Sequence, residues 1–232
     1  MPTVVITGAN RGIGLEFTRR YLDDGWRVFA MNRGHSDALR ELAQNDELIL
    51  LQAELTSPDD LAKIGERLDS ETIDLVINNA GIMGTDTFRQ DNRQRQGLYD
   101  FNRDEWRSVF EINLFTPMHL IALLRPNLAT GARLVTVSSS MGSIAENAFG
   151  GWYAYRASKA AVNSLMKSVA LELGDAVIAI ALHPGWVRTD MGGPDADIDV
   201  QTSVAGMMDV ITGLEPEDNG AFLGFDGRRI DY

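Results

Sequence analysis

The stretch that decides the fold spans residues 3–14 and reads TVVITGANRGIG. Its first five residues are apolar or β-branched, which predicts a buried β-strand. Glycines follow at Gly8, Gly12 and Gly14, and residues 12–24 then show helical spacing. A strand that enters a helix through a glycine-rich turn is typical of a phosphate-binding loop, because the free N–H groups of the helix start can face phosphates. The stretch therefore predicts a dinucleotide-binding α/β fold.

Each of the three glycines has its own expected task. Gly8 permits a tight turn out of the strand, Gly12 lets the backbone approach a pyrophosphate, and Gly14 lets the helix pack closely on the sheet. The spacing is G-x-x-x-G-x-G instead of the more familiar G-x-G-x-x-G. An ordinary glycine-rich turn is the alternative, and the flanking strand and helix make it the less favoured one.

The rest of the chain continues the alternation of strand and helix. Apolar runs predict strands at 27–31, 48–52, 73–78, 133–138, 177–183 and 221–225. Helical spacing predicts helices at 37–43, 57–68, 104–128, 152–173 and 201–214, with a kink near Pro117 and a polar loop at 84–102. The expected architecture is a doubly wound, Rossmann-type parallel sheet of about seven strands with helices on both faces. A length of 232 residues without repeat or linker favours one domain over residues 1–232.

Composition narrows the classes of function. The chain has 33 acidic and 21 basic residues, and the net charge of −12 argues against nucleic acid or an anionic membrane as a partner. There is no cysteine, which excludes disulfides and thiolate catalysis. No histidine cluster has the spacing of metal ligands, so we expect no metal. We find no signal peptide and no apolar run of about 20 residues, and therefore expect a cytoplasmic protein.

The end of the second predicted strand bears on the type of dinucleotide. Folds of this kind place an acid there for the ribose 2′-hydroxyl of NAD, or an arginine nearby for the 2′-phosphate of NADP. This chain has Asn32 and Arg33 at that point, and Arg11 is a second cation in the phosphate loop. Because a guanidinium binds phosphate in a bidentate manner, the sequence predicts NADP(H). The alternative is that both arginines are solvated surface charges.

A second set of residues predicts proton-transfer chemistry. Tyr155 and Lys159 are spaced i, i+4 and share one face of a predicted helix. We expect the lysine ammonium to lower the phenol pKa from about 10 toward neutrality, which suits a general acid/base. Residues 138–140 are serines at the end of a strand, where a hydroxyl can hydrogen-bond a substrate oxygen. A merely polar strand end is the alternative for these serines.

Taken together, these motifs resemble the short-chain dehydrogenase/reductase family, in its single-domain branch, over nearly the whole chain. The resemblance rests on Thr7–Gly14, Asn78-Asn79-Ala80-Gly81, Asn113, Ser139, Tyr155 with Lys159, and Pro184-Gly185. Residues 138–159 and 184–191 are most similar to the C-factor and sniffer-like carbonyl reductase subgroup.

The resemblance implies a catalytic tetrad. Asn113 would hold a helix distortion and a water that relays protons to Lys159. Ser139 is preferred to Ser138 because the family's serine is followed three residues later by a glycine, here Gly142. Tyr155 would be the general acid/base, and Lys159 would also bind the nicotinamide ribose.

The resemblance and the phosphate loop together imply a cofactor-binding set. It comprises Gly8, Asn10, Arg11, Gly12, Ile13, Gly14, Asn32, Arg33, Glu54, Leu55, Asn79, Ala80, Gly81, Tyr155, Lys159, Pro184, Gly185, Val187 and Thr189. The chain departs from the family at Glu54, where aspartate is usual. The interval between Ser139 and Tyr155 is long, which indicates an enlarged loop at 145–151.

The substrate pocket is expected to be apolar. Its candidates are Met141, Phe149, Trp152, Trp186 and Met191, with plain core packing as the alternative for each. The expected function is NADPH-dependent hydride transfer between nicotinamide and a small carbonyl or alcohol substrate. The alternative is a dinucleotide-binding signalling or regulatory protein with little turnover, and the length leaves little room for a sugar epimerase. The resemblance also implies a homo-oligomer, a dimer or tetramer, paired through helices 104–128 and 152–173.

Overall fold

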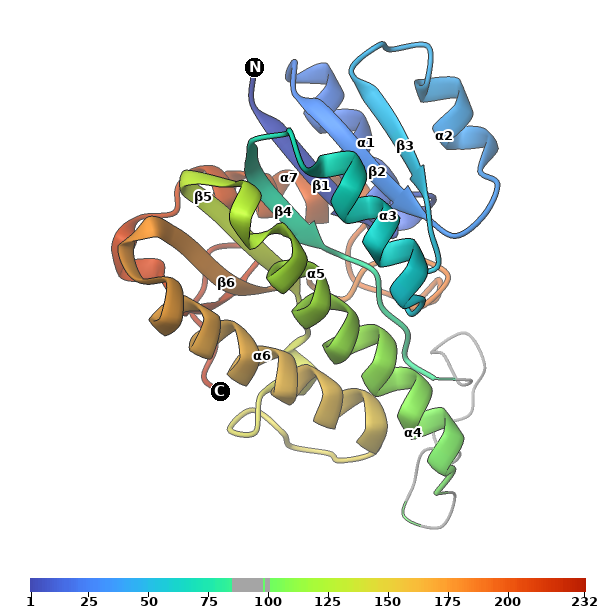
Figure 1. The fold of residues 1–232 in the computed structure, drawn as a ribbon. Helices are drawn as coiled ribbons and strands as arrows, with labels where there is room; N and C mark the ends of the chain where they lie inside the picture. Colours follow the sequence, from blue (N-terminus) through green and yellow to red (C-terminus); the bar gives the residue numbers. More distant parts are fainter. Residues whose placement is uncertain (85–97, 99–100) are drawn as a thin grey trace.

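The computed structural model describes residues 1–84, 98 and 101–232. Its centre is one sheet of seven strands in the order β3-β2-β1-β4-β5-β6-β7, and every neighbouring pair is parallel (Figure 1). The strands are β1 (Thr3–Thr7), β2 (Arg27–Asn32), β3 (Leu48–Gln52), β4 (Ile73–Asn78), β5 (Leu128–Val137), β6 (Val177–His183) and β7 (Phe222–Gly224). The predicted parallel sheet is thus confirmed.

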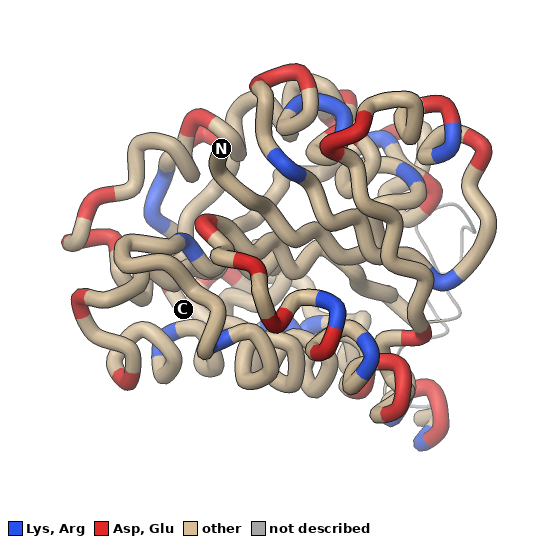
Figure 2. The backbone as a smooth tube through the Cα atoms, turned by 45° about the horizontal axis from the view of Figure 1, so that its top comes forward, with Lys and Arg blue, Asp and Glu red and all other residues tan. Residues whose placement is uncertain are grey.

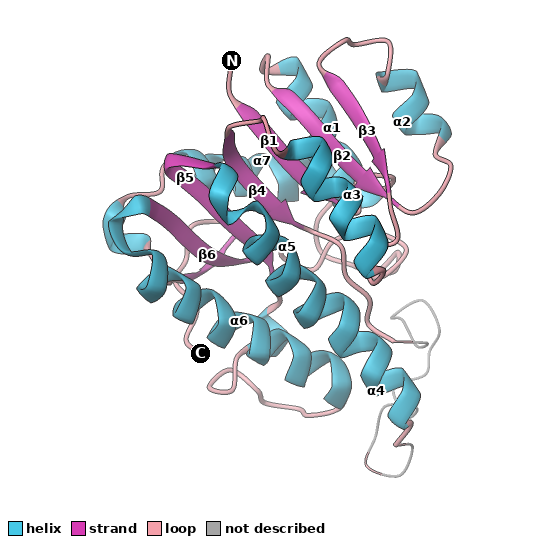
Figure 3. Cartoon of the chain, viewed as in Figure 1, coloured by secondary structure: helices cyan, strands magenta, loops and turns pink. Residues whose placement is uncertain are grey.

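Helices cover both faces of the sheet. They are α1 (Gly12–Asp23), α2 (Asp37–Leu42), α3 (Pro58–Leu68), α4 (Arg103–Phe110), α5 (Thr116–Leu124), α6 (Tyr153–Leu173) and α7 (Val200–Thr212). In Figure 3, α3, α5 and α6 lie in front of the sheet, and α1 and α7 lie behind it. Alternate residues of β1 supply the two cores, because Val5 packs in the cluster of the first face and Val4 and Ile6 pack in that of the second. The fold is doubly wound, as predicted.

Capping residues explain where several helices begin. The hydroxyl of Ser57 accepts the Asp60 N–H at the start of α3, and Pro58 fills the first turn of that helix. The Asn102 side chain accepts two N–H groups at the start of α4. By contrast, α1 starts after Arg11 without a side-chain cap. The start of α1 therefore keeps N–H groups for a ligand at the carboxyl edge of the sheet.

The predicted helix 104–128 is wrong in its detail. Residues 103–124 are instead α4, a π-helical segment (Glu111–Phe115) and α5, followed by a 3₁₀ turn at Arg125–Asn127. Pro117 lies in the first turn of α5, where its missing N–H costs little, so it is not the point of distortion. The helix ends before Pro126, and β5 therefore starts at residue 128 instead of 133. The predicted loop 84–102 lies mostly outside the described residues.

The strand order places the site. It reverses between β1 and β4, and in open α/β sheets the crevice at the carboxyl ends of such strands binds ligands. Figure 2 shows acidic and basic residues mainly on the helices and loops, around a sheet whose strands carry few of either. None of the described helices has the length and apolar character needed to cross a bilayer.

Candidate active site

The glycine-rich loop is held by hydrogen bonds from the end of β4. The Asn79 amide donates to the carbonyls of Thr7 and Gly8 at 3.0 and 3.3 Å. The Thr7 hydroxyl accepts the N–H groups of Asn79 and Ala80, both at 3.0 Å. A Cβ on Gly14 would lie 2.2 Å from the Gly8 carbonyl oxygen, so only glycine fits that close approach. These bonds join the end of β1 to the end of β4. We call the resulting structure, Thr7–Gly14 with Asn79 and Ala80, the glycine-rich cradle.

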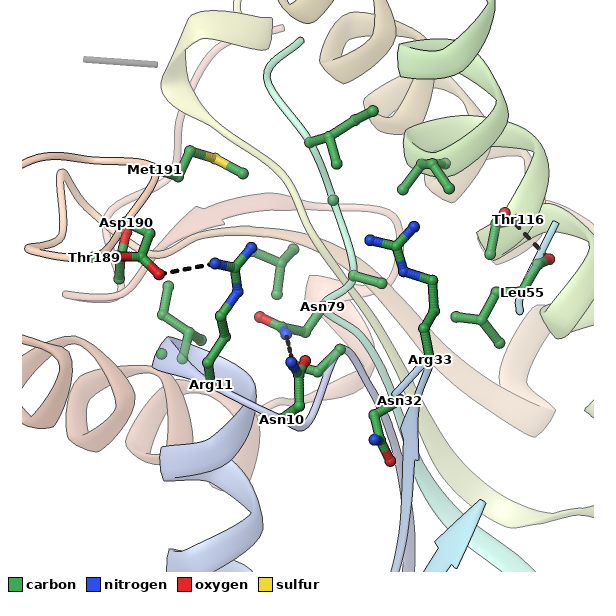
Figure 4. Close-up of a pocket in the computed structure, with 18 of the residues that line it drawn as sticks. Asn10, Arg11, Asn32, Arg33, Leu55, Asn79, Thr116, Thr189, Asp190 and Met191 are labelled. Carbon is green, nitrogen blue, oxygen red and sulfur yellow. Dashed lines mark hydrogen bonds and ion pairs between the residues drawn. The ribbon is translucent and has the colours of Figure 1, made fainter. Parts of the chain in front are cut away.

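Beside this cradle lies a cleft of about 1540 Å³. Most of the predicted cofactor-binding set lines it, and Figure 4 shows Asn10, Arg11, Arg33 and Thr189 among these residues. Tyr155 and Lys159 line the same cleft. Gly14, Gly185 and Val187 are not among the lining residues. Gly14 packs against the loop, and Val187 is buried and bridges to Ile198. These residues shape the walls of the cleft and do not face its interior.

The two predicted phosphate-binding arginines line the cleft from different elements. Arg33 follows β2, is 71% exposed, and its Nη1 lies 3.6 Å from Oε2 of Glu54. Arg11 precedes α1 and forms a 2.8 Å ion pair with Asp190, in the loop after β6 (Figure 4). Sequence reasoning did not single out Asp190, and the signal was an acid directly after Thr189. Each arginine therefore has an acidic neighbour, and an anionic ligand would compete with that acid for the guanidinium.

Tyr155 lines the cleft and Ser139 is its neighbour, although Ser138 and not Ser139 is among the lining residues. Tyr155 is 7% exposed in the first turn of α6, and the Ser139 side chain is close enough to its phenol to lower the phenol pKa. The Ser139 hydroxyl also accepts the Met141 N–H at 3.2 Å. Ser138 is engaged elsewhere, because its hydroxyl donates to Oδ1 of Asn163 at 2.6 Å. The Ser138 hydroxyl is thus occupied by Asn163 although Ser138 lines the cleft, and Ser139 stays the predicted member of the tetrad.

Lys159 lies one turn further along α6. It is 4% exposed, its Nζ donates to the Val137 carbonyl at 2.8 Å, and Nζ lies 5.7 Å from the centroid of the Tyr155 ring. Burial lowers the pKa of Lys159 to about 8. Burial also raises the pKa of Tyr155 to about 12, against a smaller lowering by the Ser139 hydrogen bond. The predicted lowering of the phenol pKa by Lys159 is therefore not found in this structure, because desolvation by burial outweighs the effect of Ser139.

Asn113 lies in the π-helical segment, at the helix distortion that the resemblance implied. Its side chain pairs twice with the Ile82 backbone, donating to the carbonyl at 2.8 Å and accepting the N–H at 2.9 Å. It also donates to the Ser158 hydroxyl at 3.0 Å. A Cβ on Gly81 would lie 3.3 Å from Oδ1 of Asn113 and 3.6 Å from Nζ of Lys159. The segment after β4 thus lies between Asn113 and Lys159.

The predicted apolar substrate pocket is not assembled around Tyr155. Met191 lines the cleft, whereas Met141, Phe149, Trp152 and Trp186 do not. Phe149 is 71% exposed and meets Trp152 edge to face, with ring centroids 6.3 Å apart. The Trp186 indole donates to the Gly192 carbonyl at 2.8 Å. These aromatic residues stabilise the loops on which they lie, a role that spacing alone could not distinguish from a pocket wall.

Comparison with known proteins agrees with this geometry. A family model described as short chain dehydrogenase matches residues 2–198, and the chain therefore belongs to the short-chain dehydrogenase family of oxidoreductases. The chain is 40% identical to C-signal of Myxococcus xanthus over 163 residues, which are 69% of this chain and 93% of that protein.

Two solved structures share the whole fold. The carbonyl reductase Sniffer of D. melanogaster superposes with a TM-score of 0.88 at 30% identity and covers 100% of both chains. An NADPH-bound carbonyl reductase from chicken fatty liver superposes with a TM-score of 0.87 at 31% identity, over 100% of this chain and 99% of the other. The predicted resemblance to the C-factor and sniffer-like subgroup is thereby confirmed.

Proposed function

We propose that this protein is an NADP(H)-dependent oxidoreductase that transfers hydride between nicotinamide and a small carbonyl or alcohol substrate. The observation that carries the proposal is that Tyr155 and Lys159 line the same cleft as the glycine-rich loop, with Ser139 next to Tyr155. The NADPH bound to the chicken carbonyl reductase supports the same cofactor here.

The residues of the cleft fit a dinucleotide. The cradle at Gly8 and Gly14 has no room for side chains, and the uncapped start of α1 offers N–H groups to phosphates. Arg11 and Arg33 line the cleft and suit a 2′-phosphate. When bound, the nicotinamide supplies or accepts the hydride.

The chain's own residues supply the proton. A phenol whose pKa is about 12 stays protonated at neutral pH, so Tyr155 can donate its proton to a carbonyl oxygen during reduction. The Ser139 hydroxyl would hydrogen-bond the same oxygen. Lys159 would bind the ribose and favour the phenolate once the proton has left, and Asn113 would hold a water that relays protons to Lys159. The direction of the pKa shift suits reduction better than oxidation.

The regulatory alternative is less favoured. The similarity to C-signal is what speaks for it. A pure sensor has no chemical need for a buried tyrosine beside a serine and a lysine, and both structural relatives above are named carbonyl reductases. The predicted small-molecule substrate, homo-oligomer and cytoplasmic location form part of the same proposal.

The test starts with cofactor binding. NADPH and NADH are titrated by fluorescence, and a panel of ketones and aldehydes is then screened for NADPH oxidation. Tyr155→Phe should bind NADPH as the wild type does and lose about 10²–10⁴-fold in turnover, the usual contribution of acid–base catalysis. Unchanged turnover in this variant would contradict the mechanism.

The cofactor preference is tested at the β2 end. Arg33→Ala should weaken NADPH binding about tenfold or more and NADH far less, because only NADPH carries the 2′-phosphate. Equal weakening of both cofactors would argue against that role.

A further inference from the structure

Arg156 follows Tyr155 in the chain and is 8% exposed. Its Nε lies 3.2 Å from the Gly150 carbonyl and 3.1 Å from the Gly151 carbonyl, and its Nη1 donates to the Met141 carbonyl at 3.2 Å. Its Nη2 is buried without a hydrogen-bond partner in the structure. Burying a cation is costly, and burial lowers the pKa of Arg156. Backbone carbonyls, and not a carboxylate, are the hydrogen-bond acceptors found for this guanidinium among the described residues.

The three carbonyls belong to the two ends of one segment. Met141 lies two residues after Ser139, in the 3₁₀ turn that the Ser139 hydroxyl caps. Gly150 and Gly151 lie directly before α6, which carries Tyr155 in its first turn. The Arg156 side chain therefore joins the turn of the serine to the helix of the tyrosine.

The backbone before α6 needs such support. Gly150, Gly151 and Trp152 have φ angles of +65°, +71° and +46°, and Trp152 is the non-glycine residue with positive φ in the described part of the chain. A left-handed conformation costs a residue with a side chain roughly 1–2 kcal/mol. The ring of Phe149 covers the guanidinium, with Cζ 4.6 Å from the ring centroid. Bound carbonyls and a stacked ring offset the strain of this tight entry into α6.

We propose that Arg156 is a positioning residue that fixes the Ser139 hydroxyl against the Tyr155 phenol. This inference rests on the proposed function. Arg156 does not line the cleft and would not touch substrate or cofactor. Without its guanidinium, the turn at residues 140–142 can move relative to α6, and the two hydroxyl groups lose their shared geometry. The glycine-rich loop follows β1, away from Arg156, and α6 keeps its own helical hydrogen bonds, so we expect Arg156 to affect cofactor binding much less than turnover.

The test compares Arg156→Met, Arg156→Lys and the control Arg40→Met, which changes an exposed arginine on α2. Turnover in carbonyl reduction is expressed per NADPH-binding site, so that a loss of folded protein is not counted. Arg156→Met should lose about 100-fold in kcat, as a misplacement of about 1 Å can, with the NADPH Kd within about twofold of the wild type. Arg156→Lys keeps the cation and can reach one carbonyl, and should lose about tenfold or less. A merely structural role would lower the Tm and leave kcat per site unchanged.

Hydrogen exchange provides a readout that does not depend on activity. The N–H groups of Met141 and Gly142 are bonded to Ser139, and they should exchange faster in Arg156→Met and to a smaller extent in Arg156→Lys. Arg40→Met should leave them unchanged. If the wild type binds NADPH but reduces no carbonyl, the proposed function fails, and exchange alone decides whether Arg156 holds the turn. Unchanged exchange, or a kcat per site equal to that of Arg40→Met, overturns the inference, and Arg156→Lys serves for both measurements where Arg156→Met does not fold.

Discussion

Burial favours the neutral form of both titratable side chains at the catalytic end of the cleft. It lowers the pKa of Lys159 to about 8 and raises that of Tyr155 to about 12. A protonated phenol is the acid that carbonyl reduction requires, and a lysine that gives up its proton near pH 8 can return one to the phenol through a water. The two shifts therefore suit proton delivery, whereas sequence spacing alone indicated only that the two groups are neighbours.

The pKa of Lys159 makes stability depend on pH. Between about pH 8 and pH 10.5 the unfolded chain binds the lysine proton and the folded chain does not, so the free energy of unfolding rises with pH in that range. Lys159→Met removes this contribution. The unfolding free energy of the wild type minus that of Lys159→Met should therefore increase from pH 8 to pH 10.5, measured by urea titration at several pH values. A difference that is flat across this range would show that Lys159 is not desolvated as the structure indicates.

The close approach at Gly14 predicts that alanine destabilises the fold at this position and not at Gly34. The Cβ of Gly14→Ala would lie 2.2 Å from a backbone oxygen, whereas that of Gly34→Ala would meet nothing within 4 Å. Gly14→Ala should lose about 1–3 kcal/mol of stability through overpacking and weaken NADPH binding. Gly34→Ala is the control for stability and should leave the free energy of unfolding unchanged. Urea unfolding and NADPH fluorescence measure the two effects, and similar stability of the two variants would exclude a special role for Gly14.

Among the elements, the buried strands and most helices were predicted closely, and the segment from α4 to the start of β5 was not. The bounds of β1, β3, β4 and β6 coincide with the predicted ranges, because buried parallel strands are continuous apolar runs between turn residues. The helix pattern alone predicted a kink near Pro117, because proline is a visible sequence signal, and only the family resemblance indicated a distortion at Asn113. The Asn113 contacts that accompany the distortion join residues far apart in the chain. The same reason explains why the sequence did not single out Arg156 and why it placed the aromatic residues in a substrate pocket. Their partners are backbone carbonyls and loops, which no side-chain spacing reveals.

The π-helical segment gives a prediction with a matched control. Asn113→Ala leaves the backbone groups of Ile82 without their side-chain partners and should cost about 1–3 kcal/mol of stability. Asn127→Ala removes a similar set of bonds, because the Asn127 amide donates to the carbonyls of Leu68, Asp69 and Glu71. Both variants should unfold at lower urea concentration. Only Asn113→Ala should lower kcat per NADPH-binding site, and an equal loss in Asn127→Ala would reduce Asn113 to a structural residue.

For the whole molecule, the net charge of −12 says little about the cleft. The electrostatic potential in the cleft depends on its own charged residues, above all on two arginines that each have an acidic neighbour. One of these pairs, Arg11–Asp190, joins the phosphate loop to the loop after β6. An anionic cofactor entering the cleft competes with Asp190 for the Arg11 guanidinium. We therefore expect Asp190 to oppose binding of the cofactor that Arg11 favours.

This competition predicts tighter NADPH binding in Asp190→Asn. At low salt the Kd should fall about two- to fivefold, the range expected for an exposed charge pair. At about 1 M salt, where the Debye length is about 3 Å, wild type and variant should converge. Asp195→Asn is the control, because it removes the same charge from an exposed residue of the same loop that does not line the cleft. Equal effects of the two variants would assign the change to net charge alone, and weaker binding in Asp190→Asn would mean that the ion pair closes the cleft around the cofactor.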